Sequence, residues 1–286
     1  MTSATPIQRR SQEMPATPPM PATLALYGAA YLYGSLPFVY VLGRMQRVDL
    51  RRIGSGNVGA TNLLSAGSGA NGTGKRAIRI GLAALGWTLD ASKGLLPARM
   101  ALQLGFSRRH ANLAAVCGVA GQCWPLLLGL RGGRGISAFV GAAYAISPRA
   151  WTLTITPMIG GGMWRVAPLL APLLARRFTG GAAPASLPES GEAFRRSKSV
   201  PLGCFLATLV FPLACALLDR PSSPIADRQH HTCAANAGAD FAPILLSAII
   251  VLRRLTAIQP DDATSGPRHQ PTALLYRLLY DRNTNR

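Results

Sequence analysis

The stretch Ala22–Gly43, ATLALYGAAYLYGSLPFVYVLG, decides the fold class, because it contains no Asp, Glu, Lys, Arg or His. As an α-helix that rises about 1.5 Å per residue, this stretch reaches roughly the 30 Å of a bilayer core. The rest of the chain has a similar character, since 49% of its 286 residues are hydrophobic and only 14% are charged. These numbers exclude a disordered chain and indicate a membrane protein rather than a soluble domain.

Further apolar stretches extend this prediction to an all-α, polytopic integral membrane bundle of about seven transmembrane helices. Ile80–Phe106 is apolar enough to span although it contains Asp90 and Lys93, which are neighbours on one helix face. We expect these two charges to pair with each other, because an isolated charge in a bilayer is costly. The other single spans are Ala111–Leu130, Ser199–Leu218 and Phe241–Leu252, of which the last needs residues before Asp240 to cross.

The stretch Ile136–Ala175 is too long for one span and is expected to form two. The tripeptide Ser147-Pro148-Arg149 is a natural turn between them. The second half is predicted to be a poor helix, because glycines and prolines interrupt it at Gly160, Gly161, Gly162, Pro168 and Pro172.

The basic residues follow the predicted topology. The net charge is +19, and with seven spans 20 of the 30 Lys and Arg residues fall on one face and 8 on the other. This asymmetry is the positive-inside pattern, so the richer face is predicted to be cytoplasmic and the N-terminus to lie outside. No basic helix interleaved with aromatic residues occurs, which argues against nucleic acid as a partner.

The segments outside the membrane domain of residues 22–256 differ from it in composition. Residues 1–21 are expected to be a disordered leader, and residues 178–197 a flexible cytoplasmic insertion. The tail of residues 257–286 contains leucines at helical spacing, compatible with a short amphipathic helix on the membrane surface. The five cysteines are not spaced as a zinc or redox motif, so neither a metal nor a cofactor is expected.

Two glycine-rich segments on the predicted cytoplasmic face carry the candidate chemistry: IGSGNVGATN at Ile53–Asn62 and RGGRG at Arg131–Gly135. Glycines let successive backbone N–H groups converge on an anion, while short polar side chains and arginines add donors and charge. The alternative is that both segments are flexible turns between helices. The predicted phosphate-binding residues are Gly54, Ser55, Gly56, Asn57, Gly59, Thr61, Asn62, Arg131, Gly132, Gly133, Arg134 and Gly135.

These segments resemble motifs of the acyl-phosphate:glycerol-3-phosphate acyltransferases of bacterial membranes. The resemblance runs through roughly residues 28–148 and continues weakly at 200–203. The motifs that carry it are Gly34–Phe38, Val48–Arg52 with the string Gly54–Asn62, Leu89–Gly94 and Gly121–Gly135. The long string of glycine and asparagine is the most specific of them.

The resemblance implies a seven-helix integral membrane enzyme with a cytoplasmic-facing site. Such an enzyme passes the acyl group of a fatty acyl phosphate to the 1-hydroxyl of glycerol 3-phosphate, and releases lysophosphatidic acid and phosphate. Gly54–Asn62 would hold the acyl-phosphate head and Arg131–Gly135 would complete the pocket, with the acyl chain between helices among membrane lipids. No side chain is assigned as catalytic, because no Ser-His-Asp or paired-carboxylate arrangement occurs.

The chain departs from the family pattern at positions that, by resemblance, hold glycerol 3-phosphate or support the reaction. Gln122 stands where the family has histidine, and glutamine cannot exchange a proton near neutral pH. The other departures are Ser65 for a basic residue, Pro201 for a serine, and Leu252–Ala257, which lacks an expected histidine and asparagine. We therefore expect an altered acceptor site for glycerol 3-phosphate or another phosphorylated acceptor, with Gln122, Arg253 and Arg254 as candidate contributors.

Two other functions are alternatives to acyl transfer. One is a degenerate relative that binds acyl phosphate or phospholipid without turnover. The other is a small-solute transporter, which would be expected to show internal repeats that this sequence lacks. Acyl transfer is the preferred interpretation.

Overall fold

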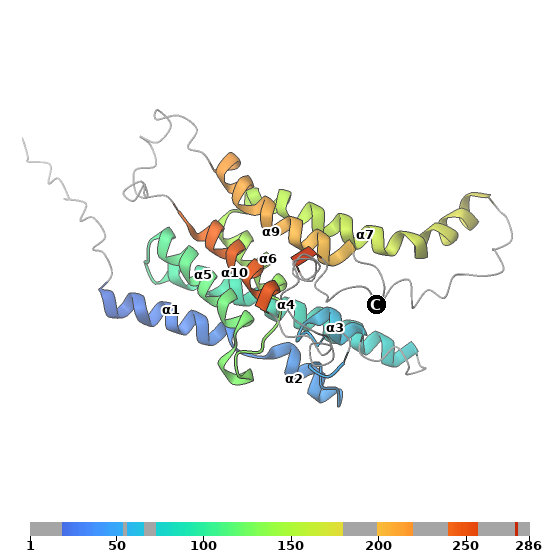
Figure 1. Cartoon of the computed structure of the whole chain (residues 1–286), viewed down its shortest axis with the longest axis horizontal. Helices are drawn as coiled ribbons and strands as arrows, with labels where there is room; N and C mark the ends of the chain where they lie inside the picture. Colours follow the sequence, from blue (N-terminus) through green and yellow to red (C-terminus); the bar gives the residue numbers. More distant parts are fainter. Residues whose placement is uncertain are drawn as a thin grey trace, which may run out of the picture.

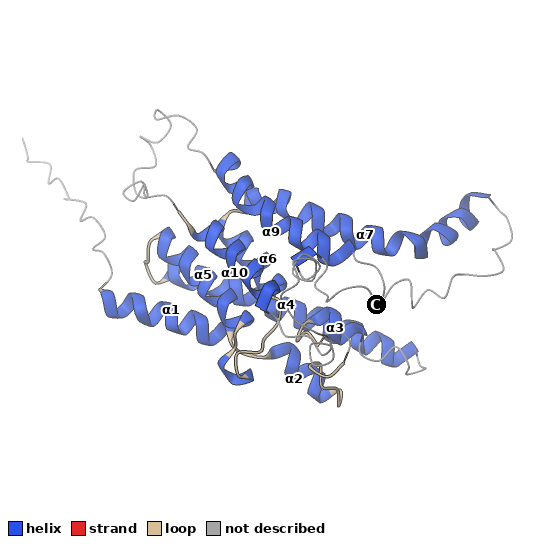
Figure 2. Cartoon of the chain, viewed as in Figure 1, coloured by secondary structure: helices blue, strands red, loops and turns tan. Residues whose placement is uncertain are grey.

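The computed structural model describes residues 19–53, 56–65, 73–179, 199–219, 240–256 and 278–279, and within these ranges the regular structure is entirely helical (Figures 1 and 2). The prediction of an all-α fold is confirmed. The elements are α1 (Met20–Gly34), α2 (Phe38–Met45), α3 (Ala60–Ser65), α4 (Thr73–Gln103), α5 (Arg108–Cys123), the 3₁₀ turn η1 (Leu126–Leu128), α6 (Ile136–Ile146), α7 (Pro148–Thr179), α9 (Ser199–Leu218) and α10 (Ala242–Thr256).

Three helical stretches in the described parts of the chain are long and apolar enough to cross a membrane. They are Met20–Met45, Arg108–Leu128 and Val200–Leu218, and the shorter Ile136–Ile146 is also apolar. Their positions agree with three of the spans expected from the sequence. The total of seven spans stays a prediction. Most of the predicted leader, insertion and tail lies outside the described residues, although α1 begins at Met20, inside the predicted leader, and α7 ends at Thr179, inside the predicted insertion.

The first predicted span is not one helix, because the helix is interrupted between Gly34 and Phe38. Proline has no N–H to donate, and it disfavours helical geometry at the residue before it. Pro37 therefore ends α1 and starts α2. The expectation of a single helix over Ala22–Gly43 was wrong at this point.

The third predicted span is also shorter as a helix than expected. α5 ends at Cys123, and Pro125 leads into η1 rather than into a continued helix. Gly129 then adopts a left-handed conformation with φ of 60°, which glycine tolerates without strain. The residues that follow can turn back as a loop at the end of α5, and this loop is the second glycine-rich segment.

The division of Ile136–Ala175 is confirmed, since α6 ends at Ile146 and α7 begins at Pro148. The expected weak second half is wrong, because α7 continues without interruption to Thr179. A membrane offers no water to exposed backbone groups, so a helix is the favoured state even across glycines. α7 also packs along α9 (Figure 1), where a Cβ on Gly203 would overlap the carbonyl oxygen of Pro157.

α5 lies at the centre of the bundle and contacts α1, α4, α6 and α10. Glycines set these approaches: a Cβ on Gly34 would overlap the carbonyl oxygen of Gly118, and a Cβ on Gly118 would overlap that of Lys93. Small residues at helix contacts are typical of membrane bundles, where van der Waals packing replaces the hydrophobic effect as the force between helices. The core around α5 is accordingly rich in alanine.

Candidate functional site

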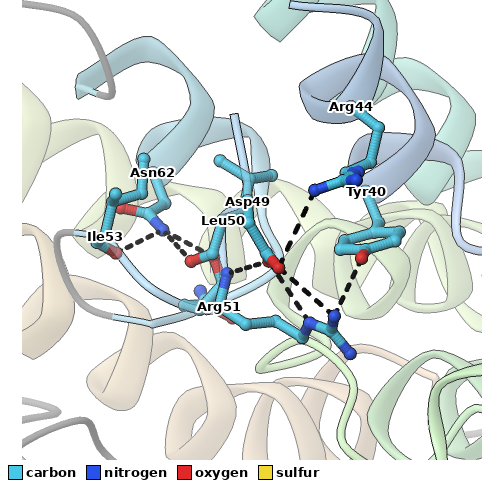
Figure 3. Close-up of polar contacts among 8 residues, drawn as sticks. Tyr40, Arg44, Asp49, Leu50, Arg51, Ile53 and Asn62 are labelled. Atoms are coloured by element: carbon cyan, nitrogen blue, oxygen red, sulfur yellow. Dashed lines mark hydrogen bonds and ion pairs between the residues drawn. The ribbon is translucent and has the colours of Figure 1, made fainter. Parts of the chain in front are cut away.

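The first glycine loop is shaped by the buried amide of Asn62 on α3. Its Nδ2 donates to the carbonyl oxygens of Leu50 at 2.9 Å, Ile53 at 3.1 Å and Asn57 at 2.9 Å (Figure 3). An amide nitrogen has only two hydrogens, so these acceptors occupy its donors. The amide nitrogen of Asn62 therefore holds the shape of the loop, and phosphate binding by this residue stays a prediction.

The same loop is preceded by an exposed polar cluster around Asp49. The Arg51 guanidinium donates to the Asp49 carboxylate through Nε and Nη2, each at 3.3 Å, and also to the Tyr40 hydroxyl at 2.9 Å (Figure 3). These hydrogen bonds from Arg51 are the main reason why the pKa of Asp49 lies below its usual value. The cluster holds the connection between α2 and the loop at the predicted membrane surface.

The second glycine loop is held from two sides. The N–H of Gly133 donates to the Gln122 carbonyl at 3.2 Å, at the end of α5. On the other side Arg253 of α10 donates through Nε to the Gly133 carbonyl at 3.0 Å and through Nη2 to the Gly132 carbonyl at 2.7 Å. A Cβ on Gly132 would overlap the Gln122 carbonyl oxygen, so only glycine fits there. These contacts hold the loop in one defined conformation, so it is not a flexible turn.

The structure brings the two predicted loops together at Gly133. A Cβ on this residue would lie 3.0 Å from the carbonyl oxygen of Val58 and 3.7 Å from Oδ1 of Asn57, both in the first loop. The two segments are far apart in sequence, so this meeting is a property of the fold. It creates a small region in which the backbone of both loops and the Asn57 side chain converge.

A buried polar cluster lies directly beside this meeting point. Lys93 Nζ is 2.8 Å from Asp90 Oδ1 on the same helix, which confirms the expected pairing of the two charges. Gln122 completes the cluster: its Nε2 donates to Asp90 Oδ2 at 2.9 Å, and its Oε1 accepts from Lys93 Nζ. The amide of Gln122 thus contacts this ion pair, and its contribution to an acceptor site stays a prediction.

Two further contacts lie at or beside Lys93, and little in the sequence indicates them. The ring centroid of Phe38 lies 5.0 Å from Lys93 Nζ, in cation–π geometry. Next to Lys93, Ser92 shares a 2.6 Å hydrogen bond with the hydroxyl of Tyr33. Phe38 lies in a motif that carries the family resemblance, but neither composition nor spacing places its ring beside a lysine.

The remaining candidates have diverse surroundings. Arg134 is buried in the second loop, while Arg131 and Thr61 are exposed. Arg254 donates to the carbonyls of Pro201 at 2.9 Å and Leu278 at 2.7 Å, and lies over the Phe205 ring, so it joins α10 to α9. Gly54, Ser55 and the side chain of Ser65 lie outside the described residues. Gly56, Gly59 and Gly135 are in the loops, and Gly56 and Gly135 have φ of 65° and 75°.

Among the described residues, no group of three or more His, Cys, Asp and Glu side chains is placed to hold a metal ion. The side-chain amides of Asn57 and Gln122 lie at the junction of the loops, and Arg134 is buried in the second loop. Such groups suit a phosphate or another oxyanion.

Comparisons with known proteins point the same way. The sequence profile of a family described as glycerol-3-phosphate acyltransferase matches residues 24–174. A glycerol-3-phosphate acyltransferase of Aquifex aeolicus is 33% identical over 147 residues, which are 51% of this chain and 71% of the relative. One from Maricaulis maris is 38% identical over 52% of this chain and 64% of the relative. One from Rubrobacter xylanophilus is 34% identical over 63% of this chain and 79% of the relative.

Solved structures of PlsY (YgiH), an integral membrane glycerol 3-phosphate acyltransferase, are also similar. Its glycerol 3-phosphate form superposes with a TM-score of 0.53 and 25% identity, over 82% of this chain and 88% of that one. Its lysophosphatidic acid form, at 24% identity and a TM-score of 0.52, shows the same fold. The superposition extends beyond residue 174, where the family profile ends.

Proposed function

Because the chain belongs to the glycerol-3-phosphate acyltransferase family, an integral membrane family, we propose that it transfers a fatty acyl group from an acyl phosphate to the 1-hydroxyl of glycerol 3-phosphate. The single observation that carries this proposal is the meeting of the two glycine loops at Gly133. Two backbone loops that converge beside fixed positive charge are suited to a phosphate leaving group.

The proposed reaction exchanges one bond to the acyl carbon for another. The glycerol 1-oxygen attacks the acyl carbonyl carbon, a new C–O ester bond forms, and the bond from that carbon to the phosphate oxygen breaks. The hydroxyl proton passes to a substrate phosphate oxygen or to a bound water, because no side chain is assigned as a base. The products are lysophosphatidic acid and inorganic phosphate.

The protein's contribution in this proposal is electrostatic. Charge gathers on the departing phosphate, and donors already fixed in place stabilise it without reorganisation. Arg134, buried within the second loop, supplies positive charge near that phosphate. Arg253 acts indirectly, by holding the carbonyls of Gly132 and Gly133 so that the loop keeps its shape.

The residues predicted for the acceptor site make contacts within the protein. Gln122 is engaged with Asp90 and Lys93, and Arg254 bonds to the backbone at Pro201. We assign the phosphate of the acceptor to Arg131, which is exposed at the start of the second loop. The acceptor is glycerol 3-phosphate in this proposal, and another phosphorylated alcohol is the alternative. The site faces the cytoplasm from a bacterial inner membrane, in keeping with the distribution of basic residues.

The test follows phosphate release by the purified protein from palmitoyl phosphate, with and without glycerol 3-phosphate. We expect acceptor-dependent release, and a loss of about tenfold in the Gly133→Ala variant, since the new Cβ pushes against the Val58 carbonyl. Gly28→Ala is the matched control, because a Cβ there meets no atom within 4 Å. Binding of palmitoyl phosphate without release under any acceptor would reduce the chain to a lipid-binding relative.

A further inference from the structure

The side chains of Asp90, Lys93 and Gln122 form a closed ring of polar contacts between α4 and α5. They are 2%, 1% and 8% exposed, so water does not compete for their hydrogen bonds. Lys93 contacts both Asp90 and Gln122, and Gln122 in turn donates to Asp90. Gln122 is the only neutral member of this ring, and its amide offers a donor and an acceptor at the same time.

Gln122 is also the member of the ring that reaches the glycine loops. Its backbone carbonyl accepts the N–H of Gly133, and its Nε2 lies 3.2 Å from the point where a Cβ of Gly133 would sit. Oδ1 of Asn57 is 3.7 Å from the same point. One residue therefore contacts the buried ion pair through its side chain and the second loop through its backbone.

We propose that Gln122 is a positioning residue, which couples the buried Asp90–Lys93 pair to the second glycine loop, so that phosphate binding at the loops requires its neutral amide. This inference rests on the function proposed above. Removal of the amide leaves Lys93 and Asp90 each without one buried hydrogen-bond partner. We expect the resulting loss of stability to disturb the second glycine loop, which Gln122 supports. A carboxylate in place of the amide sets a second negative charge against Asp90.

Two substitutions separate these effects. Gln122→Met keeps the length of the side chain but removes donor and acceptor, and we expect palmitoyl phosphate affinity and transfer rate to fall about tenfold at every pH between about 5.5 and about 8. Gln122→Glu keeps both functions while its carboxyl is protonated. We expect it to behave almost as the wild type at about pH 5.5 and to lose about tenfold towards about pH 8.

The pH response depends on the charged groups around position 122. Asp90 and Lys93 on α4 contact Gln122, while Arg134 in the second loop and Arg253 on α10 act on the thiol of the next residue, Cys123. The introduced carboxyl is buried and faces Asp90, which favours its protonated form, while the cations favour ionisation. The same pH series on the wild type provides the baseline.

The matched control is Asn112→Leu. Asn112 is a buried amide on the same helix and donates to a carboxylate, Asp240, at 2.5 Å. Its loss should lower the thermal unfolding temperature without changing affinity or rate by more than about twofold. Each variant is first checked for folding in detergent by thermal unfolding. Recovery of the Gln122→Glu variant on acidification shows that the same folded protein has regained function.

Palmitoyl phosphate binding and transfer are measured separately, so the two proposals can fail separately. A wild type that binds palmitoyl phosphate but transfers nothing contradicts the proposed reaction, and the affinities then test Gln122 alone. Wild-type affinity and rate in Gln122→Met, or a pH profile of Gln122→Glu that follows the wild type, would overturn the positioning role. A wild type that does not bind palmitoyl phosphate contradicts both.

Discussion

Arg253 donates a 2.7 Å hydrogen bond to the carbonyl oxygen of Gly132, although 121 positions separate the two residues in sequence. The contact ties α10 to a loop at the end of α5, and a second bond from Arg253 Nε to Gly133 fixes the direction of the guanidinium. Paired donors of this kind need the planar fork of arginine, which lysine lacks. The second glycine loop thus depends on a residue near the end of the described membrane domain.

Arg253→Lys should weaken the proposed transfer by about tenfold although the positive charge is kept, because one ammonium cannot reproduce both bonds. Phosphate release from palmitoyl phosphate in the presence of glycerol 3-phosphate measures the effect. Arg149→Lys is the control, since Arg149 is exposed on α7. Equal rates in the two variants would show that the paired bonds to the loop do not matter.

Asn62→Asp should destabilise the protein by about 1 to 3 kcal/mol, because a carboxylate cannot donate to the three carbonyls that Asn62 now holds. Thermal unfolding in detergent gives the loss, and Gln46→Glu, the same change at an exposed position, is the comparison. An unfolding temperature of Asn62→Asp equal to that of Gln46→Glu would contradict the role of Asn62 in folding the first loop.

Gly141→Ala should cost about 1 to 3 kcal/mol, since its Cβ would overlap the carbonyl oxygen of Ala91 where α6 meets α4. Gly81→Ala lies inside α4 with no atom within 4 Å of the new Cβ. The latter change should stabilise by about 0.4 to 1 kcal/mol, because it restricts the unfolded chain. Thermal unfolding of the two variants tests whether Gly141→Ala destabilises the protein while Gly81→Ala stabilises it. A change in the same direction in both variants would contradict close packing at Gly141.

The ionisation of Asp49 should make the stability of the protein depend on pH in the acidic range. Its folded pKa lies below the ordinary value of 3.8, chiefly because of the hydrogen bonds from Arg51. Its contribution is therefore fully present above pH 3.8 and is lost as the pH falls through the folded pKa. The difference in unfolding temperature between wild type and Asp49→Asn should shrink over that acidic range, and a difference independent of pH would refute the role assigned to the ion pair.

The proposed orientation predicts which loops react with a membrane-impermeant maleimide in intact cells. Arg109→Cys, at the exposed start of α5, should be labelled from the outside, whereas Arg131→Cys, at the other end of that helix, should be labelled only after the membrane is opened. The parent protein, with its five native cysteines, gives the background. The reverse pattern would invert the topology.

Local features of the fold could be predicted from the sequence, because they depend on neighbouring residues. The helical class follows from long apolar stretches, the break at Ser147 from proline, and the Asp90–Lys93 pair from helical spacing. The break at Pro37 and the end of α5 before Pro125 were missed, although both prolines were visible. There the prediction gave the apolar composition too much weight and proline too little. In α7 the error was the opposite, because glycines and prolines were expected to interrupt a helix that continues to Thr179.

By itself the sequence determined which segments are apolar, where positive charge accumulates and which loops have the composition of a phosphate site. The tertiary structure alone decided that these loops meet at Gly133, that Arg253 fixes one of them and that Gln122 joins a buried ion pair. Composition and periodicity act over a few residues, so they specify elements. Contacts between residues far apart in the chain arise only when glycine-lined helices pack closely enough to bring those residues together.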